Sequence, residues 1–171
     1  IRTEVTRIGA VLEGFRDFAA IGGLNLSDVD INLLLEQQVE LVRPQAQQQH
    51  IEVVFRPCQA AAVIAADRIR LEQAFLNLIV NAIEAMEGGG TLTLSTQIED
   101  DALQVTIADT GCGVPENLST KILDPYFTTK PKGTGLGLAF CDKIVRQHLG
   151  SIDFDSAATG TVFTVTLPTK T

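Results

Sequence analysis

Residues 71–86 read LEQAFLNLIVNAIEAM, and this stretch decides the fold. Its apolar residues recur at helical spacing, so it predicts an amphipathic helix. Asp67 is a suitable N-cap, and the glycines at 88–90 end the helix. The face that we expect to point into the core carries Leu71, Phe75, Leu78, Ala82 and Met86.

Two asparagines, Asn77 and Asn81, stand on one face of this helix, one turn apart. Asparagine is a poor helix former because its amide competes with the backbone for hydrogen bonds. The pair is therefore either two exposed amides or two ligand-binding groups. In the second case, one amide oxygen would bind a hard cation such as Mg²⁺.

Helical and strand patterns alternate irregularly around this helix. A second helix is expected to start near residue 30 or 32 and to end before His50, and a last helix covers 136–148 with Gly150 at its C-terminal cap. Strands are predicted at 51–55, 61–65, 91–98, 103–108, 151–155 and 161–167. This order predicts an α+β fold in two layers, with helices on one face of a mixed, largely antiparallel sheet.

The first residues form a further helical stripe. Apolar residues alternate by four and three positions, as in a coiled coil, at Ile1, Val5, Ile8, Leu12, Phe15 and Ala19. This helix either docks on its own domain or forms one arm of a bundle that dimerises. Because the chain begins with Ile in mid-pattern, we expect it to be part of a longer protein. Residues 1–22 would then belong to the bundle, and 24–171 would form one domain.

The composition is that of a globular domain. Of 171 residues, 45% are hydrophobic and 20% are charged, which excludes a disordered chain. The net charge of −8 disfavours a nucleic-acid partner. Three widely spaced cysteines indicate no zinc site, and no apolar run approaches the ~18 residues of a membrane span. We expect a cytoplasmic piece, without excluding a membrane anchor elsewhere in the parent protein.

Three further segments combine glycines with chemically active side chains. The first, Asp109-Thr110-Gly111-Cys112-Gly113, directly follows an apolar strand. Its carboxylate can accept a hydrogen bond from an exocyclic amine, and its glycines permit a ligand to approach the backbone closely. The alternative is a plain turn at the end of the strand.

Residues 110–132 show no usable periodicity, and they contain Asp124-Pro125-Tyr126-Phe127-Thr128-Thr129-Lys130. An aromatic pair in so long a loop is typical of a lid that folds over a pocket, where Lys130 would lie against phosphates. Alternatively, the aromatic side chains only fasten the loop to the core.

The last segment, Gly133-Thr134-Gly135-Leu136-Gly137-Leu138, opens the final helix. Backbone N–H groups at a helix N-terminus attract anions, and glycines leave them accessible. The segment is neither a P-loop, which needs Gly-Lys-Ser/Thr, nor a dinucleotide fingerprint, which needs a glycine at Leu138. A helix start without a ligand is the alternative.

In this order, the four segments resemble the N box, first glycine box, F box and second glycine box of sensor histidine kinase catalytic domains, in the GHKL ATPase superfamily. The final strand pattern, 160–168, fits the same resemblance. The resemblance implies the GHKL ATP-binding fold after about Gly23, preceded by the second helix of the dimerisation bundle over residues 4–20. The sequence Thr128-Thr129-Lys130 resembles that of the nitrogen-regulatory subgroup.

The resemblance implies ATP and Mg²⁺ as ligands. Asn81 would bind Mg²⁺, Asn77 would orient the phosphates and the metal, and Lys130 would lie near the γ-phosphate. Asp109 would accept a hydrogen bond from the adenine amino group, with Thr161 beside it. Gly111 and Gly113 would let the backbone approach the nucleotide. Residues 114–132 would form a mobile lid over ATP, with Phe127 as its anchor. The phosphates would be held by the turn that consists of Gly133, Thr134, Gly135, Leu136 and Gly137.

The same resemblance implies transfer of the ATP γ-phosphate to a histidine on a bundle absent from this chain. It also implies a response regulator receiver domain as a partner and a homodimer of the full-length protein. His50 and His148 do not fit the phosphoacceptor, because neither is followed by the expected acid.

Two positions bear on the alternatives. ATP-hydrolysing members of the superfamily carry a glutamate general base where Asn77 stands, which disfavours hydrolysis. Many histidine kinases carry a basic residue where Glu84 stands, so this turn lacks the basic side chain that would contact a phosphate there. A non-catalytic nucleotide-binding switch is the third alternative.

Overall fold

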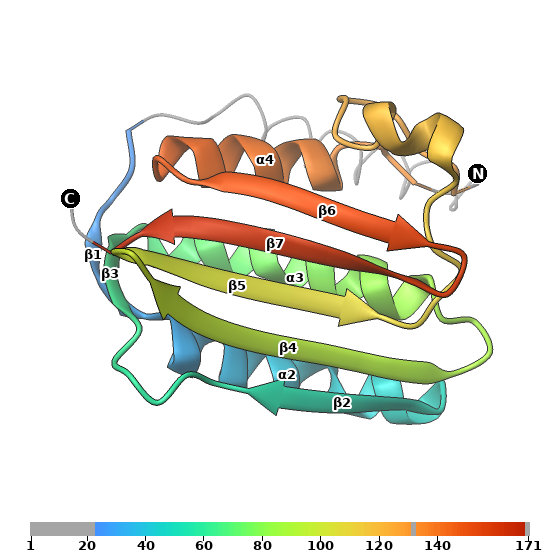
Figure 1. Cartoon of the computed structure of the whole chain (residues 1–171), viewed down its shortest axis with the longest axis horizontal. Coiled ribbons are helices and arrows are strands. Elements are labelled where there is room, and N and C mark those ends of the chain that lie inside the picture. Colours follow the sequence, from blue (N-terminus) through green and yellow to red (C-terminus); the bar gives the residue numbers. More distant parts are fainter. Residues whose placement is uncertain (1–22, 131–132, 170–171) are drawn as a thin grey trace, which may run out of the picture.

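Helices cover one face of a five-stranded sheet (Figure 1). The computed structural model describes residues 23–130 and 133–169, and the expected helix at 1–19 lies outside these ranges. The helices are α2 (Ile31–Gln48), α3 (Arg68–Glu84) and α4 (Gly137–Gln147). From one edge to the other, the strands are β2 (Ile51–Arg56), β4 (Gly90–Glu99), β5 (Ala102–Asp109), β7 (Gly160–Pro168) and β6 (Ser151–Ala157). The predicted two-layer α+β fold is confirmed.

Strand pairing in this sheet is antiparallel except at one edge, where β2 runs parallel to β4. A separate two-stranded antiparallel sheet joins β1 (Ser27–Asp30) to β3 (Val63–Ala66). The sequence analysis missed β1, because four residues are too few for a periodicity to register.

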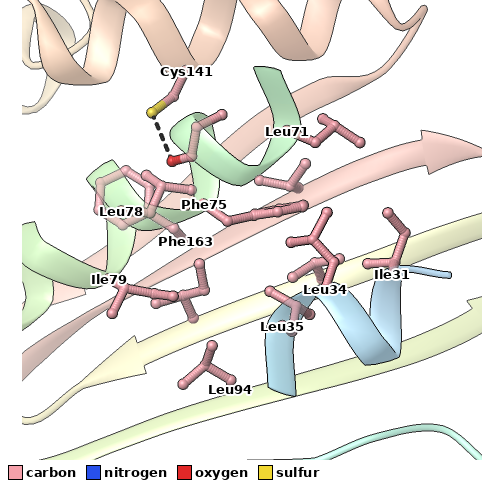
Figure 2. Packing of buried hydrophobic residues seen from close by; sticks show 14 of the residues in the cluster. Ile31, Leu34, Leu35, Leu71, Phe75, Leu78, Ile79, Leu94, Cys141 and Phe163 are labelled. Atoms are coloured by element: carbon pink, nitrogen blue, oxygen red, sulfur yellow. Dashed lines mark hydrogen bonds between the residues drawn. The ribbon is translucent and has the colours of Figure 1, made fainter. Parts of the chain in front are cut away.

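The core lies between the sheet and the helices. Residues alternate along β5, so that Leu103, Val105 and Ile107 are buried against the helical layer. Figure 2 shows the convergence of side chains from α2, α3 and the sheet, among them Ile31, Leu34, Leu35, Leu71, Phe75, Leu78, Ile79, Leu94 and Phe163.

The contact between α3 and α4 includes a buried thiol. Cys141 Sγ donates to the backbone oxygen of Ala74 at 3.2 Å (Figure 2). Burial raises the pKa of Cys141 to about 12. This cysteine is therefore protonated at neutral pH and unreactive.

Asp67 caps α3 as predicted, and Asp30 caps α2, since the side chain of each accepts a hydrogen bond from the third residue of its helix. Met86 is buried but lies just beyond α3. A short 3₁₀ helix, η1 (Glu116–Lys121), lies in the loop that showed no periodicity. Within the described ranges, no helix combines the length and apolar character needed to cross a membrane.

His148 joins the end of α4 to the start of α3. Its Nε2 accepts from the backbone N–H of Asp67 at 2.9 Å, and its Nδ1 lies 2.8 Å from the backbone oxygen of Ile144. An accepting Nε2 leaves the proton on Nδ1, so the ring is the neutral tautomer. The buried ring is thus structural, in agreement with the sequence analysis.

His148→Ala is expected to lower the free energy of unfolding by about 2–4 kcal/mol, because it leaves a cavity and a buried N–H group of Asp67 without a partner. Urea denaturation followed by circular dichroism measures this loss. The matched control is His50→Asn, since His50 is exposed and its φ of 58° is one that asparagine tolerates. A similar loss in both variants would contradict the bridging role of His148.

Candidate functional site

A cavity of about 530 Å³ opens between α3, the start of α4 and the loop at 114–130. It gathers all the site residues predicted from the sequence except Gly111 and Leu136. Those that line it are Asn77, Asn81, Asp109, Gly113, Phe127, Lys130, Gly133, Thr134, Gly135, Gly137 and Thr161. The four sequence segments therefore form one site.

Asp109 ends β5 at the inner end of this site and is 8% exposed. Its Oδ1 accepts from the backbone N–H groups of Gly111 at 2.8 Å and of Thr161 at 3.3 Å. Among the described residues, none donates a hydrogen bond to Oδ2. Burial raises the pKa of the Asp109 carboxyl, and the two backbone hydrogen bonds oppose this shift. The carboxylate is thus fixed through one oxygen, and its other oxygen can accept from a ligand.

The two glycines after Asp109 are required by the protein's own backbone. A Cβ on Gly111 would lie 2.5 Å from the backbone oxygen of Ala85, at the end of α3. Gly113 has a φ of 67°, and a Cβ there would lie 1.8 Å from the backbone oxygen of Ala157. Gly111 was predicted to contact the ligand, but it does not line the cavity and instead lets the loop pack on α3.

A hydroxyl pair supports the same wall of the cavity. Thr161, which is 4% exposed, lies with its Oγ1 2.9 Å from Ser156 Oγ. Ser156 Oγ in turn accepts from the backbone N–H of Val114 at 2.7 Å, where the loop begins. Sequence reasoning missed Ser156, because only the pairing of β6 with β7 brings it opposite Thr161.

The start of α4 faces the asparagines of α3. A Cβ on Gly137 would lie 3.9 Å from Asn77 Cγ, so the two helices approach each other at this point. Among the described residues, no side chain caps the N-terminus of α4, which leaves its first N–H groups available to an anion. Leu136, the N-cap residue, is 3% exposed and does not line the cavity, so its predicted contact with the nucleotide stays a prediction.

The loop at 114–130 contributes part of the cavity wall. Phe127 packs against the hydrophobic core and lines the cavity, which fits the predicted anchor. The backbone N–H of Tyr126 donates to the oxygen of Gly135 at 2.8 Å, and this contact ties the loop to the glycine turn before α4. Gly135 has a φ of 69°, and a Cβ there would lie 2.3 Å from the backbone of Tyr126.

Lys130 extends from this loop to α3. Its ammonium donates to Asn81 Oδ1 at 2.8 Å and forms an ion pair with Glu84. The predicted phosphate-binding lysine and the predicted metal-binding asparagine are therefore in direct contact. Glu84, noted as a departure from the usual pattern, is the second partner of the same ammonium.

The family described as histidine kinase-, DNA gyrase B-, and HSP90-like ATPase matches residues 66–171. The chain belongs to this family. Its histidine kinase branch is indicated by the nucleotide-free catalytic domain of histidine kinase ThkA, which is 31% identical. That structure superimposes with a TM-score of 0.79, over 86% of this chain and 97% of the other. The chain is thus similar to an ATP-binding catalytic domain of a sensor histidine kinase.

Longer relatives agree with this assignment. AtoS of Escherichia coli K12, a signal transduction histidine-protein kinase, is 34% identical over 96% of this chain and 28% of its own length. Full-length ShkA, solved in complex with AMPPNP, is 30% identical with a TM-score of 0.84, over 97% of this chain and 36% of ShkA. ThkA solved with the response regulator TrrA is 27% identical with a TM-score of 0.84, over 98% of this chain and 49% of the other. The chain spans well under half the length of AtoS and of ShkA.

Within the histidine kinase-like ATPase family, the site agrees with the expected division of a nucleotide pocket. A fixed carboxylate, Asp109, lines the same cavity as two amides and a lysine, and the lysine contacts one of those amides. The uncapped start of α4 lies between α3 and the loop. Such a pocket can hold a base at its inner end and an anion at its outer end.

Proposed function

We propose that this chain binds Mg²⁺·ATP in the cavity and positions the γ-phosphoryl group for transfer to a histidine on a separate helical bundle. One observation carries the proposal: a single cavity joins the carboxylate of Asp109 to the Asn77, Asn81 and Lys130 group. The carboxylate selects a ligand with an amine donor, and the two asparagines with the lysine select a metal-bound polyphosphate.

The adenine end depends on Asp109. Since Oδ1 is held by two backbone N–H groups, Oδ2 is oriented to accept from the exocyclic amine. Thr161 is fixed beside it through its own backbone N–H group. A preorganised acceptor discriminates adenine from bases that present an oxygen at the same place, because two acceptors would then face each other.

The phosphate end depends on helix termini and side chains. The free N–H groups at the start of α4 and the ammonium of Lys130 would neutralise phosphate oxygens. The amide oxygen of Asn81 suits Mg²⁺, since it already accepts from a cation in this structure. Mg²⁺, when bound with ATP, would stabilise negative charge on the transferring group. Catalysis by such a site is mainly positioning and electrostatics.

Hydrolysis is disfavoured by the side chain at 77. A general base that activates water needs a basic group within reach of the γ-phosphate, and the amide of Asn77 has none. Three carboxylates line the cavity: Asp109 is held by backbone N–H groups, Glu84 is paired with Lys130, and Glu87 follows α3 and has no ion pair among the described residues. None of them stands at position 77, where the hydrolysing members of the superfamily carry their base. We therefore favour phosphoryl transfer over ATP hydrolysis and over a purely regulatory nucleotide switch as the function of this chain.

The remaining proposals concern the parent protein. The structure of ThkA with a response regulator supports a receiver domain as the next phosphate acceptor. We propose a homodimer of the parent protein through the bundle to which residues 1–22 would belong, and a cytoplasmic location for this catalytic part.

Mg²⁺·ATP is expected to slow backbone hydrogen exchange in the predicted lid, residues 114–132, because phosphate contacts would order a segment whose described part, 114–130, lies mostly on the surface. Exchange followed by mass spectrometry, with and without Mg²⁺·ATP, tests the proposed function. Peptides from β4, none of whose residues lines the cavity, serve as the internal control and should not change. If ATP protects neither the lid nor the start of α4, the cavity is not the nucleotide site.

A further inference from the structure

Two oxygen atoms on α3 converge on one cation. The ammonium nitrogen of Lys130 is hydrogen-bonded to Asn81 Oδ1 at 2.8 Å and is ion-paired with the carboxylate of Glu84. The two acceptors lie three residues apart near the end of the helix, and both line the cavity. Residues at this spacing share one helix face, so their side chains can bind a common partner.

Glu84 is at an unfavourable position for a cavity that receives a polyphosphate. A carboxylate repels phosphate oxygens, and this repulsion is removed only when a cation lies between the two. In the present structure Lys130 supplies that cation. When ATP binds as proposed above, the γ-phosphate competes for Lys130, and Glu84 then needs another cation.

The Lys130 contact is weak enough to be exchanged. The side chains of Lys130 and Glu84 are 42% and 47% exposed, respectively. Exposed ion pairs of this kind shift an equilibrium by only about twofold to fivefold. A divalent cation that arrives with ATP carries twice the charge of the ammonium and prefers carboxylate and amide oxygens.

We propose that Asn81 and Glu84 together form a cation site, which Lys130 occupies in this structure and which Mg²⁺ takes over when it binds with ATP. Glu84 is then a second protein ligand for the metal, in addition to Asn81. This inference rests on the proposed ATP-binding function. The exposed position of Glu84 suits Mg²⁺, which keeps several water molecules when it binds to proteins.

Glu84→Gln tests this proposal through the dependence of ATP affinity on Mg²⁺. The affinity for ATP is measured by calorimetry in excess Mg²⁺ and again in excess EDTA, and the ratio of the two affinities reports the contribution of the metal. Glu84→Gln is expected to lower this ratio by about tenfold, as losses of metal-supporting groups do. In EDTA alone, the variant should bind ATP no more weakly than the unaltered chain, because it has lost a repulsive charge.

Two further variants calibrate the result. Glu87→Gln removes the same charge from the rim of the same cavity, and among the described residues Glu87 has no ion pair, so its ratio should equal that of the unaltered chain. Asn81→Ala should lower the ratio at least as much as Glu84→Gln. Equal ratios in Glu84→Gln and Glu87→Gln would overturn the inference while leaving ATP binding intact. If the unaltered chain binds no ATP with or without Mg²⁺, the proposed function itself fails.

Discussion

Asp109→Asn is expected to weaken ATP binding by about a hundredfold while leaving the fold intact, because a hydrogen bond to a charged acceptor is replaced by a clash of donors. The amide oxygen of asparagine can still accept from the N–H groups of Gly111 and Thr161. Its NH₂ group then takes the place of Oδ2 and faces the adenine amine, which is also a donor.

The same substitution is expected to change how the stability of the fold depends on pH. Burial raises the pKa of Asp109, so its ionisation costs free energy in the folded chain. The protonated Asp109 side chain therefore makes its full contribution to the free energy of unfolding below the pKa that Asp109 has in the unfolded chain. This contribution is lost as the pH rises through the pKa that Asp109 has in the folded chain. The amide in the Asp109→Asn variant does not titrate, so the stability of the variant relative to the unaltered chain should increase from acid to neutral pH.

Calorimetry measures the ATP affinity of the Asp109→Asn variant. Urea denaturation at several pH values measures its stability relative to the unaltered chain. Asp153→Asn is the matched control, since Asp153 is exposed on β6 and does not line the cavity. The control should bind ATP normally. Unchanged ATP affinity in a folded Asp109→Asn protein would contradict the adenine end of the proposed site.

The local parts of this structure could be predicted from the sequence because their causes are local. Asp67 caps α3 through the nearby backbone, and the apolar spacing of 71–83 fixes which face of the helix is buried. The placement of Asn77 and Asn81 then follows from the helix itself. The end of β5 likewise places Asp109 at the edge of the sheet.

The parts that escaped prediction depend on pairs of residues distant in sequence. Gly113 is needed because Ala157, at the end of β6, lies against it. Ser156 reaches Val114 only because β6 pairs with β7. The sequence pattern likewise contained no sign that Lys130 contacts Glu84. The contact depends on how the loop packs on α3, which is a property of tertiary structure.

The chain of 171 residues is expected to bind Mg²⁺·ATP without labelling itself, because neither of its histidines can reach the γ-phosphate. His148 is buried, with both ring nitrogens engaged by the backbone of Asp67 and Ile144. His50 precedes β2 and does not line the cavity. A nucleophile that is not held in line with the phosphorus loses the rate contribution of orientation.

A longer form of the protein that includes the proposed phosphoacceptor bundle should label itself at least about a thousandfold faster than the 171 residues alone, since on the proposed function the bundle would hold a histidine in line with the γ-phosphate. Incubation with γ-labelled ATP measures the rate, and phosphohistidine is recognised because it is labile in acid and stable in base. Asn81→Ala in the longer form should abolish the label, whereas His148→Gln should reduce it only as far as it destabilises the fold. Comparable labelling of the 171 residues on a histidine would show that His50 or His148 is functional. If the longer form releases phosphate but never carries it, ATP hydrolysis becomes the better account, despite an amide at position 77 in place of a general base.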